Sequence, residues 1–222
     1  MTSPPPPPVP PTDGPTDGEL LEAWRAGDAT AGEQLFARHY RLLKRYFRNK
    51  IGAEHIADLM QETFVASVES RERVSDAGRF RAYLLRIAYH VLCRHLRKRS
   101  REAPEADLDE VSIEQLDPGA VSVIARTQEQ RLLLEALRSI PVNYQVVLEL
   151  HYWEDLKTDR IAEVLGVPAA TVRSRLQRAR DALQAAMDRL ARSRDVLEST
   201  LTRLDDWAAR CGRDLGGPGD DG

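Results

Sequence analysis

Apolar residues recur along most of this chain at steps of three and four, the spacing of one face of an α-helix. A short helix is expected around Leu20, Leu21 and Trp24, ending at Gly27. Asp28 is a good N-cap for a longer helix that stops near Gly52. The apolar positions of this second helix are Leu35, Phe36, Tyr40, Leu43 and Phe47.

Two further helices complete a first group. One is expected from about 53 to 70, with Ile56, Leu59, Met60 and Phe64 facing inward and Asp58, Gln61 and Glu62 on its polar side. The other begins at Phe80 and ends at about Arg99, with Leu84, Ile87, Ala88, Val91 and Leu92 as its core face. These four helices can bury one another and form a first domain over residues 19–101.

A second domain is expected over residues 121–190. One of its helices carries Leu132, Leu133, Leu137 and Ile140. Pro141 opens the next helix, which carries Val142, Val146, Leu148 and Leu150. Trp153 and Leu156, which follow it, are expected to pack against the helices at the end of the domain.

The end of this domain has the pattern of a helix-turn-helix. Ile161, Ala162 and Leu165 share one side of a short helix, and Gly166 supplies a positive-φ turn. Pro168 suits the first turn of a second helix, in which Val172, Leu176, Ala179 and Leu183 form one stripe. Arg173, Ser174, Gln177 and Arg178 lie off that stripe, where they can contact DNA bases or phosphates. A helical hairpin with a solvated basic face is the alternative.

Charge is segregated along the chain, so the net charge of -3 is misleading. The fourth helix and the loop before it are strongly basic, with Tyr83, Tyr89, His90 and His95 interleaved, which suits partly single-stranded DNA. Core packing is an equally good reading of Tyr83 and Tyr89. Residues 102–120 are acidic and carry Pro104 and Pro118, and they read as a flexible linker.

The two ends have different compositions. Residues 1–18 are proline-rich and are expected to be a disordered tail. Residues 191–222 are expected to hold an amphipathic helix, with Leu197, Leu201, Leu204, Ala208 and Cys211 at helical spacing, and then a disordered end. No apolar run is long enough to span a bilayer and no signal peptide is evident, which predicts a cytoplasmic protein without membrane insertion.

The sequence offers no evident catalytic or metal site. Cys93 and Cys211 lie far apart, which argues against a disulfide framework. His90, Cys93 and His95 are close in sequence, but one helix would not place all three on one face. Phosphate-binding glycine loops and paired catalytic carboxylates are not apparent, so we expect neither an enzyme nor a cofactor.

Taken together, these motifs resemble the bacterial RNA polymerase sigma factors of the extracytoplasmic-function (ECF) type. DLMQETF, from Asp58, looks like the family's core-binding motif, and FRAYLLRIAYHVLCRHLRKR, from Phe80, looks like its minus-ten helix. IPVNYQVVLEL, from Ile140, and IAEVLGVPAATVRSRLQRAR, from Ile161, look like the minus-thirty-five module. The resemblance covers roughly residues 19–187 and implies an all-α fold with a region 2-like and a region 4-like domain.

The resemblance also implies roles for individual residues. Asp58, Gln61 and Glu62 would bind core polymerase at its β′ subunit, and the loop 71–79 would capture a flipped base. The acidic linker would lie in the RNA channel of the polymerase. The minus-ten strand would be held by Arg79, Arg81, Tyr83, Arg86, His90, Arg94 and Arg97. The minus-thirty-five duplex would be held by Thr171, Arg173, Ser174, Gln177 and Arg178.

Some positions depart from the family pattern. Tyr83 stands where the family usually has Trp, His90 where it often has Asn, and Lys157 where the first helix of the turn usually opens with Ser. The expected partners are the β and β′ subunits of core polymerase and promoter DNA, and the sequence leaves an anti-sigma protein open. A dimeric helix-turn-helix repressor or activator remains the alternative function.

Overall fold

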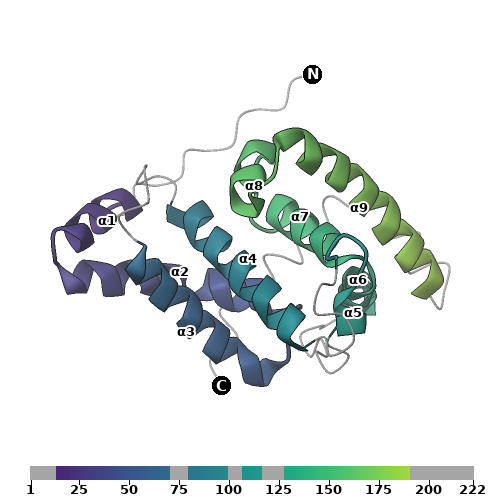
Figure 1. Ribbon diagram of the computed structural model, residues 1–222, viewed down its shortest axis with the longest axis horizontal. Helices are drawn as coiled ribbons and strands as arrows, with labels where there is room; N and C mark the ends of the chain where they lie inside the picture. The colour runs from purple at the N-terminus through teal and green to yellow at the C-terminus, as the bar shows by residue number, and fades with distance from the viewer. Residues whose placement is uncertain (1–13, 71–79, 100–106, 117–127, 191–222) are drawn as a thin grey trace.

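The structure is a computed structural model that describes residues 14–70, 80–99, 107–116 and 128–190. These residues form helices and turns (Figure 1). The first group comprises α1 (Asp17–Arg25), α2 (Ala29–Arg48), α3 (Ala53–Glu69) and α4 (Phe80–Arg99). The second group comprises α5 (Ile113–Leu116), α6 (Gln128–Ser139), α7 (Val142–Tyr152), α8 (Thr158–Leu165) and α9 (Ala169–Leu190).

The first helix begins two residues earlier than expected. Thr16 and Glu19 form a capping box, in which Thr16 Oγ1 accepts from the Glu19 amide at 3.3 Å and Glu19 accepts from the Thr16 amide at 2.7 Å. Residues 17 and 18, which the proline-rich composition had placed in the tail, are therefore helical. The S/T-x-x-E signal was present in the sequence and was missed.

Aromatic side chains hold the first domain together. Phe36 lies between Trp24 and Phe64, with ring centroids 5.1 and 4.8 Å away, and Phe80 packs 6.5 Å from it. Asp28 caps α2 as expected, accepting from the Thr30 and Ala31 amides. The prediction for Tyr40 was wrong, because its side chain is 49% exposed. Leu42 and Tyr46, rather than Tyr40, complete the buried stripe of α2.

The helix-turn-helix has the expected turn. Gly166 adopts φ 68°, a left-handed conformation that glycine accepts without strain, and the stripe of α9 is buried. Lys157 occupies the N-cap of α8 without a side-chain hydrogen bond, and Thr158 is the first helical residue. Pro168 precedes α9, and its carbonyl accepts from the Val172 amide at 3.2 Å.

The middle of the acidic segment is packed against the second domain, which corrects the expectation of a flexible linker for residues 107–116. Leu108, Ile113 and Leu116 are buried. The Val111 and Leu108 carbonyls accept hydrogen bonds of 2.9 Å from the amides of Val142 and Asn143, at the start of α7. Apolar residues spaced between the acidic ones anchor this part of the segment, and the remainder of 102–120 lies outside the described residues.

The two groups of helices lie against one another. In Figure 1, α4 runs across the molecule between α2 and α3 on one side and α7 and α8 on the other. One continuous set of buried apolar side chains extends through both groups. In the described part of the chain, no helix has both the length and the apolar character needed to cross a membrane.

Candidate polymerase and nucleic-acid interface

The exposed face of α3 is formed by the predicted core-binding residues. Asp58 and Glu62 are one helical turn apart, Gln61 lies beside them, and all three are exposed. Leu59, Met60 and Thr63 are buried on the opposite side. The acidic face is therefore not needed for the core and is available to a partner.

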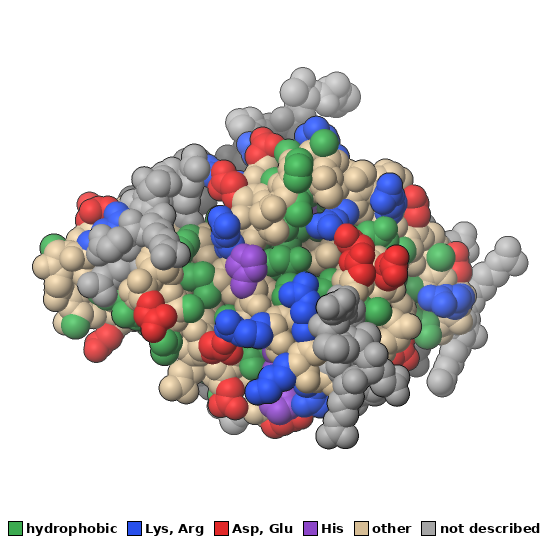
Figure 2. Space-filling model, viewed as in Figure 1, with side chains coloured by type: hydrophobic (Ala, Val, Ile, Leu, Met, Phe, Trp, Pro, Cys, Tyr) green, Lys and Arg blue, Asp and Glu red, His purple; other side chains and the backbone are tan. Residues whose placement is uncertain are grey.

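Four of the predicted minus-ten residues form one stripe on α4. Arg86, His90, Arg94 and Arg97 follow one another at steps of four, four and three, and all four are exposed. Figure 2 shows Lys and Arg side chains, with a His among them, along the course of α4. Arg94 forms an ion pair with Glu62, so the basic stripe lies directly beside the acidic face of α3.

The stripe changes the protonation of its histidine. Partial burial lowers the pKa of His90, and the nearby cations Arg86 and Arg97 lower it further. His90 is therefore neutral near pH 7 and becomes a third cation between its neighbours only at lower pH or beside an anion.

The other predicted minus-ten residues lie elsewhere. Tyr83 faces α3, where its hydroxyl contacts Ser70 Oγ and donates to the Ser67 carbonyl at 3.4 Å. Arg81 faces the second domain, where its Nη2 donates to Glu154 Oε2 at 2.5 Å. Arg79 lies outside the described residues, as does the loop 71–79. Tyr89, which the sequence left open between packing and base stacking, is buried and donates from its hydroxyl to Asn143 Oδ1 at 2.7 Å.

The predicted minus-thirty-five residues are together on the outer side of α9. Arg173, Ser174, Gln177 and Arg178 are exposed and Thr171 is half-buried. Ser174 Oγ donates to the Thr171 carbonyl at 2.9 Å, and Gln177 Nε2 donates to Asp181 at 3.3 Å. Among the described residues, Arg173 and Arg178 make no ion pair, so both guanidinium groups are available to DNA.

The boundary between the two domains also contains buried ion pairs, which were not foreseen. Arg45 donates to both carboxylate oxygens of Glu154, through Nε at 2.9 Å and Nη2 at 2.7 and 2.8 Å. Lys50 pairs with Glu149, and Gln145 Nε2 donates to Glu149 Oε1 at 2.8 Å. A signal was available, because Gln145 and Glu149 are polar residues one turn apart among the apolar residues Val146, Val147 and Leu148 of α7.

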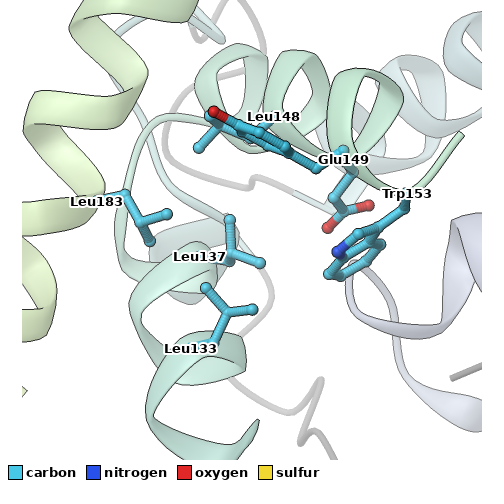
Figure 3. A pocket seen from close by; sticks show the side chains of 7 residues that line it. Leu133, Leu137, Leu148, Glu149, Trp153 and Leu183 are labelled. Carbon is cyan, nitrogen blue, oxygen red and sulfur yellow. The ribbon is translucent and has the colours of Figure 1, made fainter. Parts of the chain in front are cut away.

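The Lys50–Glu149 ion pair is buried. Lys50 is 0% exposed, and its Nζ also donates to the Tyr46 carbonyl at 2.5 Å. Glu149 lines a small apolar hollow together with Leu133, Leu137, Leu148, Tyr152, Trp153 and Leu183. Figure 3 shows Glu149 and Trp153 on the side of the hollow opposite Leu183. Burial raises the pKa of Glu149 and lowers the pKa of Lys50, and the attraction within the pair opposes both shifts.

The cysteine and histidines of α4 do not form a ligand set. Cys93 is buried and His90 is exposed, so they lie on different faces of the helix. Burial raises the pKa of the Cys93 thiol to about 11, which keeps it protonated and unreactive. Cys211 lies outside the described residues.

Comparisons with known proteins find two regions of sigma-70 factors in this chain. Residues 35–102 match the family model for sigma-70 region 2, and residues 130–183 match the model for sigma-70 region 4. The chain is 26% identical over 176 residues to the ECF RNA polymerase sigma-E factor of Escherichia coli K12, covering 76% of this chain and 92% of that protein. It is 27% identical over 177 residues to the ECF sigma-E factor of Haemophilus influenzae, covering 76% and 94%.

A solved structure has a similar fold. It is the structure of CnrH in complex with the cytosolic domain of CnrY, with a TM-score of 0.56 and 26% identity, covering 79% of this chain and 99% of that chain. Both matched regions, residues 35–102 and 130–183, are regions of sigma-70 factors. The chain belongs to the ECF family of RNA polymerase sigma factors, which bind core polymerase and direct promoter-specific transcription.

Proposed function

We propose that the acidic face of α3 binds core polymerase and that the basic stripe of α4 binds the melted minus-ten strand beside it. The observation that carries the proposal is the contact between the two surfaces through the Glu62–Arg94 pair. A protein partner on α3 and a nucleic acid on α4 would therefore meet at one edge. The partner on α3 is expected to be the β′ subunit, whose contact would be set by charge.

The experiment that tests this function is affinity purification of the tagged chain from its host. Recovery of the β and β′ subunits supports the proposal. A homodimer that brings down no polymerase would favour the dimeric helix-turn-helix regulator instead. Recovery of one small protein in place of polymerase would identify an inhibitory partner of the anti-sigma kind. The solved complex of CnrH with the cytosolic domain of CnrY supports that last expectation.

The minus-ten strand is held, in this proposal, by the four residues of the stripe, because Tyr83 is hydrogen-bonded to α3 and Arg81 is paired with Glu154. Cations on one helix face neutralise successive phosphates, and aromatic rings stack on unpaired bases. A protein that binds DNA in this way would act on the chromosome, and we propose that it is cytoplasmic.

The affinity for single-stranded DNA will increase as pH falls through the pKa of His90. The free protein holds that pKa below its usual value, whereas a bound phosphate favours the imidazolium and raises it. Binding is therefore coupled to proton uptake, and the total increase is about tenfold for each unit by which DNA raises the pKa. Fluorescence anisotropy at several pH values measures this effect. The His90→Gln variant should lose it, and an unchanged pH dependence in that variant would remove His90 from the interface.

The minus-thirty-five duplex is read or held by the outer face of α9. We expect Arg178→Ala to weaken duplex binding by about 1–3 kcal/mol, because the exposed guanidinium loses a phosphate or base contact. A phosphate contact also reduces the salt slope by about 0.9, whereas a base contact changes the sequence preference. Arg189→Ala is the matched control, since Arg189 is exposed near the end of the same helix. Equal affinities of the two variants across a salt titration would exclude Arg178 from the DNA contact.

A further inference from the structure

Residues 107–116 form a folded part of the acidic segment that is attached to the second domain. The match to sigma-70 region 4 begins at residue 130, so this part lies outside it. The Leu108 and Val111 carbonyls accept hydrogen bonds from the Asn143 and Val142 amides, which are at the start of α7 and have no acceptor within that helix. α5 packs against α6 and α4. The acidic segment is therefore anchored where α7 begins.

The side chain of Asp109 joins two helices of the second domain. Its Oδ2 accepts from Arg175 Nη2, in the middle of α9, at 2.6 Å, and its Oδ1 accepts from Asn143 Nδ2, in α7, at 3.0 Å. The Asp109 amide donates to Asp107 Oδ1 at 2.9 Å, which fixes the turn that presents this carboxylate. The side chains of Arg175 and Asp109 are 13% and 37% exposed, so the charge-assisted contact is partly shielded from water.

A second polar contact holds the opposite edge of α9. Arg180 Nε donates to the hydroxyl of Tyr152 at 2.8 Å, and the guanidinium carbon lies 5.7 Å from the centroid of the same ring. Arg175 and Arg180 are about 140° apart around the helix, since each residue turns it by about 100°. Between them lies the buried stripe of Val172, Leu176, Ala179 and Leu183. Each edge of that stripe is thus held by one arginine.

Contacts at the edges of the buried stripe control how far α9 can rotate about its axis. The predicted DNA-binding residues are on the other side of the helix, at a radius of roughly 5–6 Å, so a rotation of about 10° would move them by about 1 Å. A hydrogen bond to a base edge is lost over such a distance, because its length varies by only a few tenths of an ångström. Attraction between a cation and a phosphate falls off more gradually. Rotation would therefore affect sequence preference more than general affinity for DNA.

We infer that Asp109 is a positioning residue for promoter recognition, which fixes the rotation of α9 through Arg175 and so aligns the base contacts of its outer face. The inference rests on the proposed minus-thirty-five role of α9. Asp109 and Arg175 do not meet across the boundary with the first domain, because one belongs to the anchored part of the acidic segment and the other to α9. A residue outside the matched region 4 thereby contributes to the choice of promoter.

The test uses the full chain bound to core polymerase. The wild-type complex first selects a duplex from a randomised pool, and a copy of that duplex is made with its minus-thirty-five positions scrambled. The ratio of the two dissociation constants, measured by competition binding, gives the sequence preference at those positions. Affinity for the scrambled copy reports the contacts that do not depend on sequence.

Asp109→Asn keeps the shape of the side chain and removes its charge. We expect it to lower the preference about tenfold, which is roughly the discrimination that one base pair supplies, and to change affinity for the scrambled copy by less than about twofold. Asp109→Glu retains the carboxylate and should keep most of the preference. Glu110→Gln is the matched control, since this neighbouring carboxylate is exposed and makes no ion pair among the described residues. Its preference should stay within about twofold of the wild type.

A double variant shows whether the effect acts through the Asp109–Arg175 contact. Arg175→Met should lower the preference as much as Asp109→Asn does. The combination Asp109→Asn/Arg175→Met should lower it no further, because both substitutions break the same contact. Circular dichroism and thermal melting check that each variant is folded.

Three results would overturn the inference. One is an unchanged preference in Asp109→Asn, and another is a double variant in which the two losses add. The third is tighter binding of Asp109→Asn to both duplexes with a salt slope larger by about 0.9, which would show that Asp109 shields Arg175 from a phosphate. Failure of the proposed role of α9 looks different, because Arg178→Ala would then leave the preference unchanged or the pool would yield none at these positions, and the inference would fall with it.

Discussion

Reversing the charges of Asp58 and Glu62 to lysine will abolish association with core polymerase and leave the fold intact. Both side chains are exposed on α3, and the apolar residues that secure the helix lie on its other side. Inverting the sign of charges that face a complementary surface strongly lowers the affinity for the partner, because like-charge contacts cost several kcal/mol. The expected loss of affinity is therefore more than a hundredfold, measured by co-purification with β and β′.

The reversal should cost little folding stability. Among the described residues, the reversal breaks the Glu62–Arg94 pair and places a lysine beside Arg94. Their side chains are 45% and 65% exposed, and exposed pairs contribute about 0–1 kcal/mol. Glu22→Lys/Glu33→Lys is the matched control, because it changes the net charge equally on exposed positions of α1 and α2. If the control also lost polymerase, the effect would be one of net charge. A folded Asp58→Lys/Glu62→Lys protein that still bound polymerase would disprove the role of this face.

In the structure the two domains are packed together, which is called the closed form here. Replacing Lys50 with methionine will shift the equilibrium by about 3–5 kcal/mol toward an open form, in which the domains have separated. The substitution leaves the Glu149 carboxylate buried beside an apolar hollow without its cation, and an unpaired buried charge carries a penalty of this size. Opening relieves the penalty because water then reaches Glu149. Scattering should show expansion, and hydrogen exchange of α7 should accelerate.

The double variant Lys50→Met/Glu149→Met is the control for this effect. Replacing both members by apolar side chains of similar length removes the unpaired charge and should restore most of the closed form. Expansion of the double variant to the same extent would show that the pair itself, and not the orphaned carboxylate, holds the domains.

The single Lys50→Met variant should also respond to pH. Burial raises the pKa of Glu149 in the closed form above its value in the open, hydrated form, and loss of Lys50 raises it further. A carboxyl with a raised pKa favours the state that raises it when protonated. The closed form should therefore return as pH falls below that raised pKa and be lost again as pH rises through it. An open population that does not change with pH would show that Glu149 is not the responsible group.

The surfaces that face solvent could be read from the sequence. The stripe of α9 and the left-handed turn at Gly166 follow from local rules, because helix periodicity and the glycine preference depend only on neighbouring residues. The acidic face of α3 and the stripe of Arg86, His90, Arg94 and Arg97 follow from the same periodicity. The capping box at Thr16 was equally local and could have been found.

Periodicity alone failed where one stripe could be rotated slightly around its helix. Tyr40 fits the apolar pattern of α2 as well as its neighbours do, yet it faces solvent because α1, α3 and α4 cover the adjacent side. In the acidic segment, the charge and proline content predicted a flexible linker, although Leu108 and Ile113 are buried. Whether an isolated apolar residue in a polar segment is buried depends on the part of the protein that packs against it.

The sequence by itself therefore determined the helices other than α5, most of their solvent-facing residues and the family. Only the tertiary structure decided which charges meet across the two domains. Arg45 and Glu154 are 109 residues apart, and Lys50 and Glu149 are 99 apart. No local pattern links residues at such separations, because their proximity depends on how α4 of the first domain packs against α8 of the second. As a result of that packing, the stripe of Arg86, His90, Arg94 and Arg97 is exposed to solvent, whereas Arg81 is paired with Glu154.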